Sequence, residues 1–156
     1  MSKSQKGDFY SKNGSKTFYH LTMSTNTMEF LQLNLHKTDK SNTEMNKWIT
    51  DRDNRIALCQ EPAHRKGKIS NIDSNIRVFT GVPVGKKHRP RATILINSNQ
   101  ITALKLTQFS NMDQVALLTD DSKNPGNKIV LASTYMPFDS VDSPPPANNT
   151  RADYFL

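Results

Sequence analysis

The sequence predicts an α/β fold in which β-sheet dominates. Three observations support this prediction. Short apolar runs with period-two alternation recur along the chain and predict strands. Only residues 42–52 carry a full helical pattern. That helix separates two strands by a distance that suits a crossover connection within one sheet.

Length and charge narrow the class of protein. The 156 residues suffice for one domain with a core, and 21 Lys+Arg against 14 Asp+Glu give a net charge of +7. This balance favours a polyanionic partner, nucleic acid first and an anionic membrane second. No apolar run approaches membrane-spanning length, so no transmembrane helix is predicted. The single cysteine, Cys59, excludes an internal disulfide and is expected to be a small buried residue of a strand.

The first 27 residues differ from the rest of the chain. They are rich in Ser, Lys, Asn and Thr, and their aromatic residues follow neither a helical nor a strand period. Residues 1–27 are therefore predicted to be a disordered basic arm, and residues 28–156 to be the folded part.

Two strands around the predicted helix end in polar side chains. Residues 28–36 alternate between a leucine face and a face that becomes polar toward Asn34 and His36. The run Ser41 to Glu44 reads as a capping box that starts the helix. A second strand over residues 56–60 ends at Glu61. Asn34 and Glu61 are thus predicted to share one edge of a sheet.

Further strands are predicted over residues 76–80, 91–96, 101–107, 114–119 and 129–136. Two basic loops, residues 64–68 and 86–91, flank the proposed edge. They could cradle a phosphate backbone, although runs of charge are more often simply solvated.

Each candidate residue has a functional and an ordinary interpretation. Glu61 could be a ligand for a hard cation, or merely mark where a strand reaches water. Asn34 needs hydrogen-bond partners, either in a network or on a ligand. His36 could bind metal or phosphate, or be an exposed strand end. Tyr135 could donate to a phosphate oxygen, or be a core aromatic with a satisfied hydroxyl.

Five segments, in this order and spacing, resemble the endonuclease/exonuclease/phosphatase superfamily. The similarity is greatest to the apurinic-type endonuclease domain of non-LTR retrotransposons of the jockey and I type. The segments are Leu31-Gln32-Leu33-Asn34-Leu35-His36-Lys37, Ile56-Ala57-Leu58-Cys59-Gln60-Glu61-Pro62, Pro90-Arg91-Ala92-Thr93-Ile94, Asp113-Gln114-Val115-Ala116 and Ile129-Val130-Leu131-Ala132-Ser133-Thr134-Tyr135-Met136-Pro137.

The resemblance implies a four-layer α/β/β/α sandwich with mixed β-sheets. It implies a DNA endonuclease that uses Mg²⁺ (or Mn²⁺) and nicks its target for reverse transcription. Glu61 corresponds to the metal-binding glutamate, Asn34 to the active-site asparagine and Tyr135 to the tyrosine at the scissile phosphate. His36 is a tentative second metal ligand. The DNA-binding residues are expected to be Lys86, Lys87, Arg89 and Arg91.

The resemblance also implies a reverse transcriptase domain as partner and action in the nucleus. The departures from the family pattern matter equally. His36 stands where several relatives carry an acidic metal ligand, and the later Asp-x-Asn segment and final Asp-His pair have no counterpart up to Leu156. The chain is therefore expected to be an N-terminal portion, truncated at its C-terminus and catalytically incomplete. A non-catalytic basic DNA-binding module, a functionless relic and a phosphatase-type member of the superfamily remain alternatives.

Overall fold

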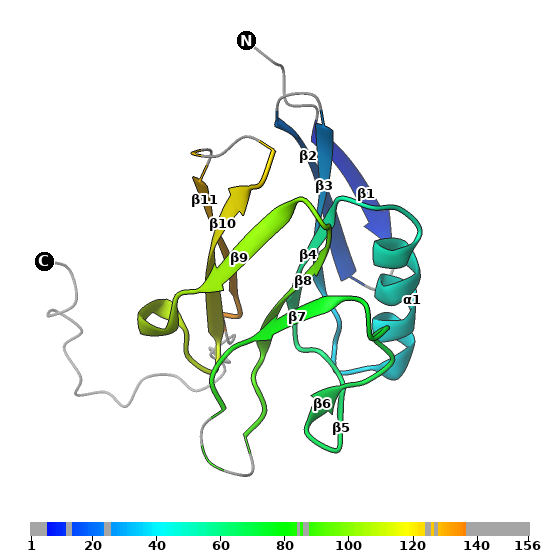
Figure 1. The fold of residues 1–156 in the computed structure, drawn as a ribbon. Coiled ribbons are helices and arrows are strands. Elements are labelled where there is room, and N and C mark those ends of the chain that lie inside the picture. Colours follow the sequence, from blue (N-terminus) through cyan, green and yellow to red (C-terminus); the bar gives the residue numbers. More distant parts are fainter. Residues whose placement is uncertain are drawn as a thin grey trace, which may run out of the picture.

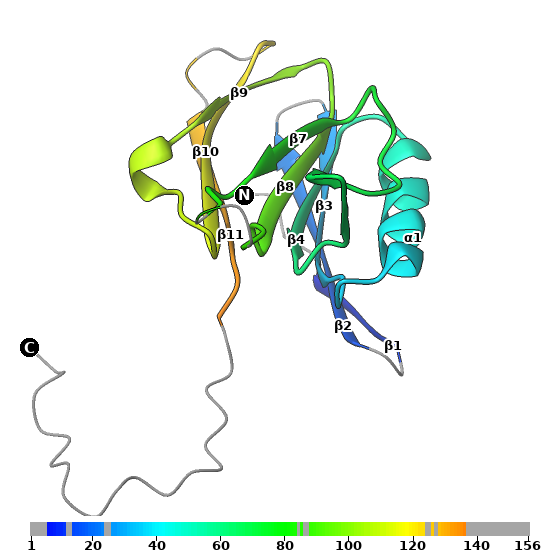
Figure 2. The same cartoon turned by 90° about the horizontal axis from the view of Figure 1, so that it is seen from below.

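Three layers of secondary structure make up the molecule (Figure 1). The computed structural model describes residues 6–11, 14–23, 26–83, 85, 88–123, 126 and 128–136, with side chains from residue 28 onward. A six-stranded sheet lies in the middle, with the single helix on one face and a three-stranded sheet on the other (Figures 1 and 2).

The central sheet is mixed, with strand order β1-β2-β3-β4-β8-β7. Its strands are β1 (Lys6–Ser11), β2 (Gly14–Met23), β3 (Asn26–Asn34), β4 (Arg55–Gln60), β8 (Ala92–Asn97) and β7 (Arg77–Thr80). β3 and β4 are parallel, which confirms the predicted crossover, and the other neighbours are antiparallel. Where a disordered arm was expected, residues 6–11 and 14–23 form a hairpin that pairs with β3.

Helix α1 (Asp39–Thr50) begins one turn earlier than predicted. The side chain of Thr38, not of Ser41, is the N-cap, and it accepts a hydrogen bond from the Ser41 main-chain N–H at 3.1 Å. The helix buries Met45 and Ile49, and these pack against the leucine face of β3 predicted from the alternation.

The three-stranded sheet is antiparallel, with order β11-β10-β9. It consists of β9 (Ile101–Lys105), β10 (Gln114–Asp121) and β11 (Lys128–Thr134), and a short 3₁₀ helix, η1 (Thr107–Phe109), follows β9. These strands match the predicted ones. The predicted basic loop after Glu61 instead contains a small hairpin of β5 (His64–Arg65) and β6 (Lys68–Ile69).

The two sheets enclose an apolar core that both of them supply. Phe30, Ile56 and Ile94 come from the central sheet, and Val115 and Leu117 from the other. A polar link crosses the same interface, where the Ser133 hydroxyl donates to the Cys59 carbonyl oxygen at 3.0 Å. Burial raises the pKa of the Cys59 thiol, which confirms its expected structural role.

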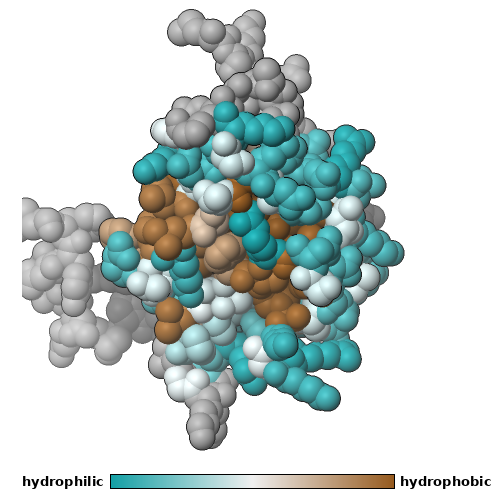
Figure 3. All heavy atoms as spheres, in the orientation of Figure 1, coloured by the Kyte–Doolittle hydropathy of each residue, from teal (hydrophilic) through white to brown (hydrophobic). Residues whose placement is uncertain are grey.

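Apolar side chains also reach the surface. Leu104 and Val130 are exposed on the outer face of the three-stranded sheet, and Val78 is exposed on β7. Figure 3 shows brown areas on this side of the molecule, separated by polar side chains. Among the described elements, no helix has the length and apolar character needed to cross a membrane.

Candidate functional site

The polar ends of two parallel strands meet at one edge of the central sheet. Asn34 is the last residue of β3, and Glu61 directly follows β4. The strand register places Asn34 opposite Gln60, and Glu61, the next residue, leaves the strand with a left-handed backbone. Asn34 Nδ2 donates to Glu61 Oε2 at 3.3 Å. The predicted shared edge is therefore confirmed.

Three residues at this edge have left-handed backbone conformations. The φ angles are 50° at His36, 55° at Lys37 and 48° at Glu61. Such conformations cost free energy for residues other than glycine and persist only where the surroundings enforce them. The enforcing contacts are main-chain hydrogen bonds from Lys37 N to Glu61 O and from Glu61 N to Arg91 O, each 2.7 Å.

The Glu61 carboxylate lies among hydrogen-bond donors. The Lys37 ammonium is 3.1 Å from Glu61 Oε1, and the side chain of Glu61 is only 14% exposed. Burial works against ionisation of the carboxyl group, yet hydrogen bonds with Lys37, Asn34 and Tyr135 hold the pKa of Glu61 below its usual value. Glu61 is consequently an anion at neutral pH, held in place on three sides.

Tyr135 reaches the site from the other sheet. It follows β11, and its main-chain N–H donates to the Asp113 carbonyl oxygen at 2.7 Å. The Arg91 guanidinium lies over the Tyr135 ring, 4.7 Å from the ring centre. Asn34, Glu61 and Tyr135, which the sequence singled out separately, are thus brought together where the two sheets meet.

His36 contributes through its main chain. Its N–H donates to Asn34 Oδ1 at 2.8 Å, which orients the amide so that Nδ2 faces Glu61. The His36 side chain is exposed. Within the described part of the chain, no group of three or more His, Cys, Asp or Glu side chains is arranged to hold a metal ion. The side-chain oxygen atoms at the edge belong to the Glu61 carboxylate and to the Asn34 amide, whose Oδ1 accepts the His36 N–H.

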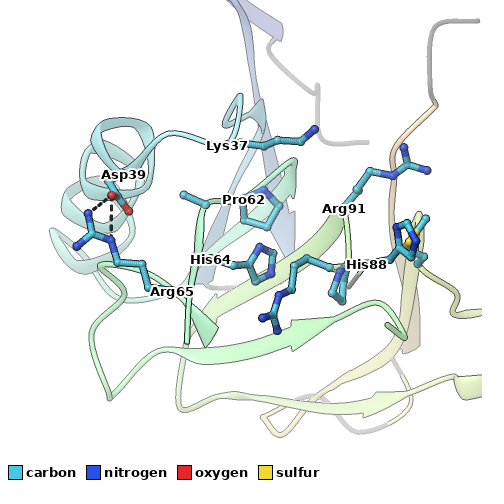
Figure 4. Close-up of a pocket in the computed structure, with 11 residues that line it drawn as sticks. Lys37, Asp39, Pro62, His64, Arg65, His88 and Arg91 are labelled. Carbon is cyan, nitrogen blue, oxygen red and sulfur yellow. Dashed lines mark hydrogen bonds and ion pairs between the residues drawn. The ribbon is translucent and has the colours of Figure 1, made fainter. Parts of the chain in front are cut away.

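A basic cleft of about 510 Å³ adjoins this edge (Figure 4). Its side chains come from the turn before α1 and the start of that helix, from the segment after β4, from the segment before β8 and, through Met112, from the segment before β10. The basic lining residues are Lys37, His64, Arg65, His88, Arg89 and Arg91. Asp39 is the acidic residue of the lining, and it pairs with Arg65. Arg89 and Arg91 thus lie in the cleft, whereas Lys86 and Lys87 fall outside the described residues.

His64 has an unpaired nitrogen in this cleft. Its Nε2 is buried and has no hydrogen-bond partner among the described groups. Burial lowers the pKa of His64 and outweighs the opposing hydrogen bond with the Pro62 backbone, while the Arg89 charge lowers the pKa further. The imidazole is therefore neutral at pH 7.

Sequence reasoning did not assign roles to two residues of this site. Lys37 directly follows the strand predicted over residues 28–36, and Asp113 directly precedes β10. Both residues lie in segments that carry the family resemblance. The only sequence signal for either residue is that a charged side chain lies next to the end of a predicted strand. Neither contact could be deduced from it, because each partner is distant in sequence.

Comparisons with known proteins bear on the fold of the chain. No family model and no curated protein matches the chain. Among solved structures, the fold is similar to the endonuclease domain of TRAS1, a telomere-specific non-LTR retrotransposon, with a TM-score of 0.52 and 21% sequence identity. The similarity covers 70% of this chain and 45% of that one, so the matched part spans less than half of its length. At this identity the likeness establishes the fold, and the predicted α/β class is confirmed.

Proposed function

We propose that this chain carries part of the active site of a DNA endonuclease that uses Mg²⁺ or Mn²⁺. The observation that carries the proposal is the convergence of Asn34, Glu61 and Tyr135 beside a basic cleft. The cleft would hold the phosphate backbone, and the three side chains would contact the phosphodiester to be cut. The fold shared with a retrotransposon endonuclease domain supports the same reading.

The Glu61 carboxylate is a suitable ligand for a hard divalent cation. Mg²⁺ keeps several waters and binds proteins through one or two carboxylates together with substrate phosphates. Glu61 would supply the carboxylate and His36 a further ligand, while Asn34, whose Nδ2 donates to Glu61 Oε2, would orient that carboxylate. A bound cation would polarise the phosphate and stabilise the leaving oxygen.

The protein residues have separate tasks in this proposal. Asn34 orients Glu61, and the phenol of Tyr135 would donate to a phosphate oxygen once DNA replaces its hydrogen bond with Glu61. None of the three is placed as a general base for water. In this proposal the three side chains bind and orient the phosphodiester. Association with a reverse transcriptase and action in the nucleus belong to the same proposal.

The basic cleft favours a second candidate function, that of a DNA-binding module which does not cut. Six basic side chains line the cleft, and Glu61 already has a cation, Lys37, 3.1 Å away. Such a module would bind DNA through counterion release alone. Its affinity would fall steeply with salt and would not depend on Glu61.

Metal dependence of DNA binding separates the two functions. Binding of a fluorescent duplex is measured by anisotropy in Mg²⁺ and in EDTA, for the wild type, Glu61→Gln and Asp53→Asn. Asp53 is exposed and precedes β4, at the opposite end of the strand from Glu61. The two variants therefore change the net charge equally, and only one alters the site.

The endonuclease proposal expects Mg²⁺ to strengthen binding by the wild type and Asp53→Asn, and not by Glu61→Gln. If DNA binding depends equally on Mg²⁺ in all three proteins, the metal does not bind at Glu61, and the result favours the DNA-binding module. A plasmid-nicking assay completes the test. Mg²⁺-dependent nicking that is lost in Glu61→Gln and retained in Asp53→Asn would support the endonuclease over the binding module.

A further inference from the structure

Arg91 lies at the junction between the two sheets. It precedes β8 by one residue, and its main chain bonds in two directions. Its carbonyl oxygen accepts from Glu61 N at 2.7 Å, and its N–H donates to the Met112 carbonyl oxygen at 2.8 Å. Arg91 is therefore fixed relative both to the sheet edge that carries Asn34 and Glu61 and to the segment that enters β10.

The Arg91 side chain forms a two-pronged ion pair with Asp113. Nε donates to Oδ1 at 2.5 Å, and Nη2 donates to Oδ2 at 2.8 Å. This fork geometry fixes the plane of the guanidinium. That plane lies over the Tyr135 ring, 4.7 Å from its centre, while the Asp113 carbonyl oxygen accepts the Tyr135 N–H at 2.7 Å. The pair thus holds Tyr135 at both its ring and its backbone.

We propose that the Arg91–Asp113 pair is a positioning device that holds the Tyr135 phenol against Glu61. The expected effect on DNA rests on the function proposed above, whereas the effect on the tyrosine does not. The main-chain bond to Asp113 extends the pairing of β10 with β11 to Tyr135, and this bond places the Tyr135 backbone but does not by itself fix the rotamer of the ring. The guanidinium supplies that orientation by covering one face of the ring.

A direct phosphate contact is the alternative role for Arg91, and it was the role expected from the sequence. Two of the five guanidinium N–H groups are already donated to Asp113, whose carboxylate offsets the charge. The two roles differ in the effect of removing Asp113. If Arg91 binds phosphate directly, Asp113→Asn frees its charge and strengthens DNA binding. If the pair positions Tyr135, the same substitution weakens binding.

The position of the ring is tested by NMR of protein labelled with ¹³C at the tyrosine ring carbons. The sequence contains Tyr10, Tyr19, Tyr135 and Tyr154, and Tyr135→Phe identifies the signal of Tyr135. Arg91→Lys keeps the positive charge but cannot form the two parallel hydrogen bonds to Asp113, and Asp113→Asn removes the negative charge that Arg91 pairs with. Both should move the Tyr135 signal toward the free tyrosine position, with the other three signals unchanged as evidence of folding. An unchanged Tyr135 signal in both variants would overturn the inference.

DNA affinity is measured for the same proteins and for the double variant. Each single substitution should weaken binding about tenfold, within the range for coupled contacting residues, and the double variant should be no weaker. Arg89→Gln provides the matched control, since Arg89 lies in the same cleft and its effect should add to that of Asp113→Asn. Stronger binding by Asp113→Asn would overturn the positioning role. If the wild type does not bind DNA, the proposed function is refuted. The Tyr135 NMR signal would still show whether the Arg91–Asp113 pair positions the tyrosine.

Discussion

Glu61 is the residue on which the site depends. Its left-handed backbone, with φ of 48°, turns the chain at the end of β4, and three neighbouring side chains contact its carboxylate. Strain of this kind tends to occur at functional sites, where packing elsewhere compensates for it. Lys37 is the neighbour that bears most directly on the proposed cation binding, because its ammonium is 3.1 Å from Glu61 Oε1 and would compete with a metal ion for the carboxylate.

Replacing Lys37 with methionine should strengthen binding of Mn²⁺. The ammonium is 3.1 Å from Glu61 Oε1 and its side chain is 67% exposed, so water screens the pair and its loss is expected to favour the metal by about 1 kcal/mol. Isothermal titration with Mn²⁺ gives the affinity. Lys40→Met, an exposed lysine of α1, provides the same change in charge away from the site. Equal gains in both variants would argue against competition at Glu61.

Acid should weaken the stabilising effect of Glu61. Its pKa is lowered in the folded protein, so its ionised form stabilises the fold above the unfolded value of about 4.3. That contribution is lost as the pH falls through the lower, folded pKa. In EDTA, Glu61→Gln should therefore be less stable than the wild type at pH 6, with the difference shrinking below pH 4. Urea unfolding at both pH values measures the difference in free energy of unfolding between the two proteins. A difference that grew in acid would contradict the lowered pKa of Glu61.

At the scale of elements, helix α1 holds the wall of the basic cleft in place. Its buried Asn42 donates from Nδ2 to the carbonyl oxygens of Ala63 and Ser70, at 3.0 and 2.8 Å. The Ala63 N–H donates to Asn42 Oδ1 at 3.2 Å. These bonds attach the small hairpin β5–β6 to the helix, so one amide replaces the sheet pairing that the hairpin lacks.

Asn42→Ala should destabilise the protein by about 2–3 kcal/mol, because it removes a hydrogen-bond partner of the buried Ala63 N–H and of the Ser70 carbonyl oxygen. The Ala63 carbonyl oxygen still accepts from the Ser70 N–H at 3.0 Å. Chemical denaturation measures the loss. Asn46→Ala on the same helix is a useful comparison, since Asn46 accepts one exposed bond from Asp73 N. A loss below 1 kcal/mol for Asn42→Ala would mean that water replaces its bonds.

At the scale of the whole molecule, the site exists because two sheets pack face to face. Glu61 belongs to one sheet and Tyr135 to the other, and the shared apolar core determines how close they lie. The segment after β7 touches the segment before β10 beside the site, where Val82 N donates to the Asn111 carbonyl oxygen at 2.9 Å. That approach requires a glycine at position 81.

Gly81→Ala should disturb this junction. A Cβ at Gly81 would overlap the main-chain oxygen of Asn111, and main-chain atoms cannot move aside as a flexible side chain can. The expected loss is about 1–3 kcal/mol, typical of an overpacked core. Gly85→Ala is the control, because its added carbon meets no atom within 4 Å among the described residues outside its immediate chain neighbours, although its φ of 66° carries a backbone cost of its own. Thermal unfolding should show the larger loss for Gly81→Ala.

The sequence by itself determined most strands, the crossover through α1 and the meeting of Asn34 with Glu61. Those features follow from alternation and from the rule that parallel strands end at the same edge, both of which are local patterns. The family resemblance placed Tyr135 in the same site. Only the tertiary structure decided how Tyr135 reaches Glu61, that Lys37 pairs with Glu61 and that Arg91 pairs with Asp113. These contacts depend on how the turn after β3 bends and how the sheets pack, and a one-dimensional pattern records neither. The start of α1 shows the same limit, since both Thr38 and Ser41 are suitable caps and the path of the chain after β3 selects Thr38.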